Sequence, residues 1–79
     1  MKYFYVVYYK GEIYEFDSAY DIAILLDFTL KNNIIYYKNS IVANYSKEYT
    51  PRECLIDFIN KNKSKVQIYT DSKIYKCIY

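Results

Sequence analysis

Runs of β-branched and aromatic residues alternate with short polar segments along this 79-residue chain. Residues 2–9 read Lys-Tyr-Phe-Tyr-Val-Val-Tyr-Tyr, a composition typical of a β-strand. Gly11, the only glycine in the chain, separates this run from residues 12–16. Because a tight turn needs a residue that tolerates a positive φ angle, the pattern predicts a first hairpin here.

The next segment changes to helical spacing. Asp17 or Ser18 is suited to the N-cap of a helix. The apolar positions that would share one helical face are Ile22, Leu25, Leu26, Thr29 and Leu30. The spacing therefore predicts a helix that runs to about Lys31.

The second half of the chain repeats this order. Residues 34–38 and 41–45 predict a hairpin, and Thr50-Pro51-Arg52-Glu53 predicts a helix start with a capping box and proline at the first helical position. Residues 65–70 and 73–78 predict a third hairpin. We therefore expect one α+β domain over residues 1–79, ordered ββαββαββ, with a mainly antiparallel sheet of about six strands and two helices on one face.

Two short motifs recur in the same order. Val6-Val7-Tyr8-Tyr9-Lys10 resembles Ile34-Ile35-Tyr36-Tyr37-Lys38, and Leu25-Leu26-Asp27-Phe28 resembles Leu55-Ile56-Asp57-Phe58. These matches suggest an internal repeat of residues 3–33 and 34–63, followed by a hairpin over 65–79. The alternative is that a biased composition produces such matches by chance.

Strand alternation sorts the side chains of the predicted sheet onto two faces. We assign to the helices the face with Phe4, Val6, Tyr8, Ile13, Ile34, Tyr36, Ile41, Ala43, Val66, Ile68, Tyr75 and Cys77. The reason is that Lys65, Gln67 and Lys76 share the other face, and such side chains stay in water. Tyr3, Tyr5, Tyr9, Tyr14, Tyr37 and Tyr69 then form a tyrosine-rich open face. Two helices about 10 Å wide cannot cover six strands about 29 Å across, so an apolar area should remain open for a partner.

A second apolar stripe follows the predicted first helix. Tyr20, Ile24 and Phe28 are spaced i, i+4 and i+8, nearly opposite the core-facing residues. Either another element covers these three side chains, or they form a contact patch.

Composition narrows the setting of the protein. Ile, Lys, Asn, Tyr and Phe make up 44 of the 79 residues, which indicates an AT-rich genome of a low-GC bacterium, its phage or a plasmid. The net charge is only +2, and neither a membrane span nor a secretory signal is visible. Cys54 and Cys77 do not resemble a disulfide framework, so we expect a reducing bacterial cytoplasm.

The sequence contains no pattern for catalysis or cofactor binding. The chain has no histidine and one glycine, which excludes histidine-based triads, histidine metal sites and a glycine-rich phosphate loop. Asp27 and Asp57 occupy matching repeat positions, and we expect both to be solvated surface charges. We therefore predict a non-enzymatic protein without cofactor or metal.

Three interpretations of the tyrosine-rich face remain. It could bind a protein, it could stack on single-stranded nucleic acid with Lys65, Lys73 and Lys76 on the phosphates, or it could simply be wet. One arginine and a modest net charge favour the protein interpretation, with a host protein or ribonucleoprotein complex as partner, self-association as a further option and nucleic acid as the second choice. The predicted partner-binding residues are Tyr3, Tyr5, Tyr9, Tyr14, Tyr37, Tyr69, Lys65, Lys76, Tyr20, Ile24 and Phe28.

In its size, its AT-rich composition and its lack of catalytic residues, the chain resembles small phage-encoded proteins that block host defence, anti-CRISPR proteins among them. The resemblance concerns general character and transfers no residue. It implies a non-enzymatic inhibitor or modulator of a host macromolecular complex, such as a CRISPR-Cas effector.

Overall fold

The computed structural model describes residues 3–78, with the side chain of Tyr3 outside the described part. Its elements in chain order are β1 (Tyr3–Tyr9), β2 (Glu12–Phe16), α1 (Ala19–Leu25), β3 (Phe28–Lys31), β4 (Ile34–Tyr37), β5 (Ser40–Asn44), α2 (Pro51–Lys61), α3 (Lys63–Thr70) and β6 (Lys73–Ile78). Within this range the protein is α+β, with six antiparallel strands and three helices. The predicted class is therefore confirmed, and the predicted element order is not.

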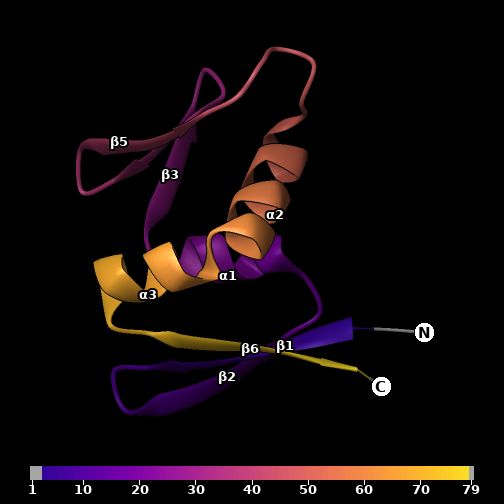
Figure 1. The fold of residues 1–79 in the computed structure, drawn as a ribbon, viewed down its shortest axis with the longest axis vertical. Coiled ribbons are helices and arrows are strands. Elements are labelled where there is room, and N and C mark those ends of the chain that lie inside the picture. The colour runs from indigo at the N-terminus through magenta and orange to yellow at the C-terminus, as the bar shows by residue number, and fades with distance from the viewer. Residues whose placement is uncertain (1–2, 79) are drawn as a thin grey trace.

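The strands form two sheets rather than the single sheet that we predicted. One sheet has the order β2-β1-β6 and the other the order β3-β4-β5, each with three strands. In Figure 1 the three helices lie on one side of the β2-β1-β6 sheet, and the β3-β4-β5 sheet stands beside α2. α1 packs against α2 between the two sheets. On the other side of the β2-β1-β6 sheet, no helix or strand of residues 3–78 is packed.

The first helix is shorter than predicted. The backbone of Asp27 adopts a left-handed conformation, with φ of 62°, which ends the helical path after Leu26. Residues 28–31 then alternate between buried or half-buried and exposed positions and pair with β4. Asn32 and Asn33 connect the two strands with φ of 53° and 62°, the angles of a tight hairpin turn that asparagine tolerates. This asparagine pair is the turn signal that the helical pattern concealed.

The predicted third hairpin is wrong in its first strand. Residues 63–70 form α3, which follows α2 almost directly, since Asn62 ends α2 and precedes α3. The Asn62 carbonyl accepts a hydrogen bond from the Val66 N–H at 2.9 Å. A strand would place Val66 and Ile68 on one face, whereas a helix places them on different sides. Val66 is completely buried, whereas Ile68 is 76% exposed. β6 pairs with β1, which lies at the other end of the chain.

The face assignment of the first hairpin is inverted. Tyr5 and Val7 are buried beneath the helices, whereas Tyr8 is exposed on the opposite face. The prediction failed because it oriented the sheet by Lys65 and Gln67, which belong to α3. The second hairpin is also inverted at Ile35, which is completely buried, and at Ile41, which is exposed. Ala43 packs against the core as predicted, because the register shift between Ile35 and Tyr36 places it opposite Ile35.

Both sheets share one hydrophobic core. Its largest completely buried residue is Phe58 of α2, whose ring lies 5.2 Å from that of Phe28 in β3. Val7 of the first sheet and Ile35 of the second belong to the same cluster. The two sheets therefore do not form separate cores.

The start of α2 confirms the local sequence signal. The Thr50 hydroxyl accepts a hydrogen bond from the Glu53 N–H at 3.2 Å, and the Glu53 carboxylate accepts one from the Thr50 N–H at 3.0 Å. Pro51 occupies the first helical position. The bond from the Thr50 N–H, with a smaller contribution from the Thr50 side chain, lowers the pKa of Glu53, because it stabilises the charged carboxylate.

Candidate functional site

A cleft of about 470 Å³ lies where both sheets end near the C-terminus of α3. It is lined by Tyr9, Lys10, Asp27, Tyr37, Lys38, Tyr69, Thr70 and Asp71, and we call it the tyrosine cleft. The last two residues of the recurring Tyr-Tyr-Lys motif line it in both copies, Tyr9-Lys10 from the first hairpin and Tyr37-Lys38 from the second. The fold therefore brings two similar sequence motifs to one place.

Aromatic contacts connect the tyrosine cleft to the core. The centroid of the Tyr37 ring lies 5.1 Å from that of Phe28, which is buried, and 5.7 Å from that of Tyr69. Tyr69 is 40% exposed, so the aromatic series runs from the interior to the surface. A ring held in this way offers contact area with little loss of conformational entropy on binding.

Four charged residues surround these rings, two of each sign. The Lys10 ammonium lies 5.1 Å from the centroid of the Tyr9 ring, and that of Lys38 lies 5.4 Å from the centroid of Tyr37. All four occupy turn positions with left-handed backbone, namely Lys10, Asp27, Lys38 and Asp71. Among residues 3–78 no ion pair joins any of them to another group. The tyrosine cleft therefore presents both cations and anions to a ligand.

The structure places the predicted binding residue Tyr5 inside the protein. Its hydroxyl donates to the Asn60 side-chain oxygen of α2, and its ring lies about 6 Å from the ammonium groups of Lys63 and Lys76. Burial lowers the pKa of Lys63, and repulsion from Lys76 adds to this effect. Tyr5 therefore anchors the sheet to the helices and is not accessible to a partner.

The other predicted sheet residues lie apart from one another. Tyr14 stacks on Phe16 at 6.1 Å and donates to Glu12 at 2.7 Å, a hydrogen bond that raises the pKa of Tyr14. Lys65 is exposed on α3, and Lys76 lies at the β6 edge of the sheet. Of the predicted set, Tyr9, Tyr37 and Tyr69 are the residues that line the tyrosine cleft.

The predicted stripe on the first helix is not a stripe on one helix. Phe28 begins β3 and is buried in the core, which corrects its assignment to the helix. Tyr20 and Ile24 stay on α1 and border a separate hollow that Phe28 also lines. The Arg52 guanidinium lies 5.8 Å from the Tyr20 ring and donates to the Ser18 hydroxyl at 3.5 Å, so α2 partly covers this region.

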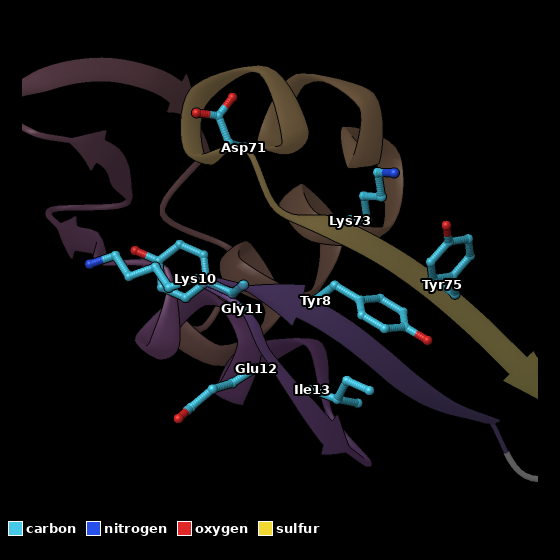
Figure 2. A pocket seen from close by; sticks show the side chains of 9 residues that line it. Tyr8, Lys10, Gly11, Glu12, Ile13, Asp71, Lys73 and Tyr75 are labelled. Carbon is cyan, nitrogen blue, oxygen red and sulfur yellow. The ribbon is translucent and has the colours of Figure 1, made fainter.

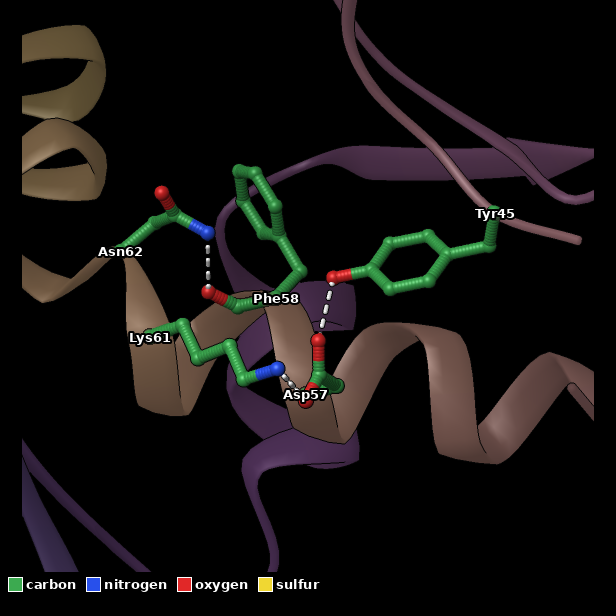
Figure 3. Close-up of polar contacts among 5 residues, drawn as sticks. All are labelled: Tyr45, Asp57, Phe58, Lys61 and Asn62. Atoms are coloured by element: carbon green, nitrogen blue, oxygen red, sulfur yellow. Dashed lines mark hydrogen bonds and ion pairs between the residues drawn. The ribbon is translucent and has the colours of Figure 1, made fainter.

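A polar network joins the second sheet to α2 (Figure 3). The Tyr45 hydroxyl donates to one oxygen of Asp57 at 2.8 Å, and the Lys61 ammonium lies 3.1 Å from the other. Burial favours the neutral form of Asp57, but the bonds from Tyr45 and Lys61 outweigh it and lower the pKa of this carboxyl. Burial and the Asp57 bond together raise the pKa of Tyr45. Asp57 is therefore a structural residue rather than a solvated charge.

A second hollow, of about 510 Å³, lies on the uncovered side of the β2-β1-β6 sheet. Figure 2 shows Tyr8, Ile13 and Tyr75 close together beside it. These are three of the residues that the inverted assignment placed in the core. The sheet therefore has an uncovered face with apolar side chains, as expected, but these are Tyr8, Ile13 and Tyr75 rather than the predicted tyrosines.

Sequence reasoning missed the charged residues of the tyrosine cleft. Lys10 and Lys38 close the two copies of the Tyr-Tyr-Lys motif, so the repeat itself was the available signal. Asp71 had no comparable signal, because its position depends on α3.

No helix within residues 3–78 has the length and apolar character needed to cross a membrane. The same range contains no group of three or more acidic or cysteine side chains suited to a metal ion, and Cys54 and Cys77 are free thiols. No protein-family model, curated protein or solved structure matches the chain.

Proposed function

We propose that this chain is a small non-enzymatic binding protein that holds a segment of a partner protein in the tyrosine cleft. The observation that carries the proposal is the convergence of Tyr9, Tyr37 and Tyr69 with two lysines on one cleft. Tyrosine is enriched where protein interfaces gain most of their binding energy. The volume of the cleft suits a few side chains of a partner.

The charges of the cleft favour a protein over nucleic acid. A strand of phosphates near Lys10 and Lys38 would also approach Asp27 and Asp71, and the like charges would repel. A protein segment can present both signs together with apolar groups, and so complement all four residues. Nucleic acid remains the second candidate because aromatic rings with nearby lysines also suit the stacking of unpaired bases.

The general resemblance to phage-encoded anti-defence proteins suggests the setting of this binding. The partner would be a host protein or ribonucleoprotein complex in the bacterial cytoplasm, such as a CRISPR-Cas effector. The protein would act by occupying a surface that the complex needs for its own function.

Affinity capture from a lysate of a low-GC bacterium tests the proposal. Immobilised wild-type protein should retain a specific protein after nuclease treatment and after a wash at high salt. The double variant Tyr69→Ala/Lys38→Glu should lose it. Retention that disappears with nuclease, or that falls steeply with salt, would support nucleic acid instead. Equal retention by the double variant would contradict a role for the tyrosine cleft.

A further inference from the structure

The side of the β2-β1-β6 sheet that faces away from the helices is a surface of mixed apolar and charged residues. We call it the outer face and define it by Val6, Tyr8, Ile13, Glu15, Lys73 and Tyr75. Three large side chains are strongly exposed on it: Tyr8 at 44%, Ile13 at 63% and Tyr75 at 51%. The rings of Tyr8 and Tyr75 meet edge to face at 5.7 Å. No other element covers them in Figure 1.

The strand register fixes where each group stands on the outer face. Val6 of the central strand pairs with Glu15 on β2 and with Tyr75 on β6. Tyr8 pairs in the same way with Ile13 and Lys73. The acidic group therefore lies on the β2 edge, and the basic group and the tyrosine hydroxyl lie on the β6 edge. Among residues 3–78 neither Glu15 nor Lys73 has an ion-pair partner.

We propose that the outer face binds the outer face of a second copy of this chain, with a twofold axis parallel to β1. Such an axis keeps each residue's position along the strands and exchanges the two edges of the sheet. β6 of one copy then lies over β2 of the other, while Val6 and Tyr8 each face their own counterparts. Two sheets packed in this way lie about 10 Å apart, close enough for side chains to interdigitate.

This arrangement pairs the charged groups that each copy leaves unpaired. Tyr75 of one copy faces Glu15 of the second copy, and Lys73 stands one pair of residues further along the same strand. The hydroxyl and the ammonium can both donate to the carboxylate, and the symmetry provides this contact twice. A twofold axis perpendicular to the strands would instead lay β2 over β2 and leave both carboxylates without a donor. The charge layout therefore favours the parallel axis and a second copy as occupant.

The size of the outer face determines how strong a dimer we expect. Three strands span about 14 Å, so the contact is smaller than the roughly 800 Å² per partner of a standard specific interface. We therefore expect a weak dimer that forms at high protein concentration rather than an obligate one.

Sedimentation equilibrium with exchanged charges tests the dimer. The wild-type mass should rise from 9.6 kDa toward twice that value between about 1 μM and 1 mM protein. Glu15→Lys alone and Lys73→Glu alone should each weaken the dimer at least about tenfold, since like charges then meet twice. An equimolar mixture of the two variants should recover the wild-type mass, because each lysine then faces a glutamate. Lys65→Glu, on the exposed surface of α3, is the matched control and should behave as wild type.

The proposal is overturned if the wild type stays at 9.6 kDa throughout this range. It is also overturned if either single variant dimerises as strongly as wild type, or if the mixture fails to recover. Circular dichroism of each variant at low concentration establishes that it is folded, and all substituted positions are exposed. None of them lines the tyrosine cleft, so the dimer and the binding of a partner protein at that cleft are tested independently.

Discussion

Two adjacent valines in β1 have opposite environments. Val7 is completely buried under the helices, whereas Val6 lies on the outer face and is only half-buried. Since successive side chains of a strand point to opposite faces, these two residues report the orientation of the whole sheet. The same substitution at the two positions, valine to alanine, therefore tests which face of the strand is buried.

Val7→Ala should destabilise the protein by about 2 kcal/mol, because two buried methyl groups are lost and a cavity remains. Val6→Ala should cost less than about half as much, because the side chain keeps part of its contact with water in the folded state. Urea denaturation of both variants measures the difference. A larger loss for Val6→Ala would mean that the sheet faces the other way.

The lowered pKa of Asp57 predicts how stability depends on pH. Its folded-state pKa lies below the unfolded value, so the ionised form contributes stability above the unfolded pKa of about 4. This contribution should disappear as the pH falls through the lowered folded-state pKa. Asp57→Asn should therefore be less stable than wild type at pH 7, and the difference should shrink below pH 4, about where carboxyl groups protonate. A difference that stays constant down to pH 2, about the lower limit of such titrations, would contradict the network with Tyr45 and Lys61.

At the scale of elements, α3 is the part of the fold that sequence periodicity described least well. Val66 and Ile68 are two positions apart, so a strand would place them on one face and a helix separates them. In the structure they are the extremes of the segment, completely buried and 76% exposed.

Val66→Asp should unfold the protein or lower its unfolding free energy severely, because a carboxylate would enter the core without a partner. Ile68→Asp should change that free energy by less than about 0.5 kcal/mol, as expected for an exposed site. Thermal unfolding followed by circular dichroism compares the two. Similar losses for both substitutions would show that residues 63–70 are a strand.

The elements that could be predicted are those with strong local signals. The α2 start was evident from Thr50-Pro51 and Glu53, since the capping box is a property of neighbouring residues. β3 could not be distinguished from the end of a helix, because Leu30 continues the core-facing helical spacing, Phe28 continues the second stripe, and both also fit strand alternation. The sequence of α3 predicts a strand because it is short and contains β-branched residues, which favour strands. The packing of Val66 in the core overrides this preference.

At the scale of the whole molecule, the site depends on how two sheets are placed. The repeated Tyr-Tyr-Lys motif was visible in the sequence, and all three tyrosines that line the cleft were among the predicted binding residues. The sequence could not predict that Tyr9 and Tyr37 line one cleft, because it left the strand order of the expected single sheet open. Division into two sheets over a shared core allows the ends of both hairpins to converge.

Two tyrosines provide the most direct test that the tyrosine cleft binds a partner protein. Tyr69 and Tyr49 are 40% and 39% exposed, and the ring of each contacts the ring of one other tyrosine. The rings of Tyr69 and Tyr37 are tilted, with centroids 5.7 Å apart, and those of Tyr49 and Tyr45 meet edge to face at 5.2 Å. Tyr69 lines the cleft, whereas Tyr49 lies in the segment before α2. The two tyrosines therefore match in exposure and in having one tyrosine neighbour, and only Tyr69 lies at the tyrosine cleft.

The measurement is the dissociation constant of the captured partner for wild type, Tyr69→Ala and Tyr49→Ala, by titration calorimetry. We expect Tyr69→Ala to weaken binding at least about tenfold, equal to about 1.4 kcal/mol, as for an interface hot spot. Tyr49→Ala should stay within about twofold of wild type. Equal affinities for the two variants, or a greater loss for Tyr49→Ala, would contradict binding at the tyrosine cleft.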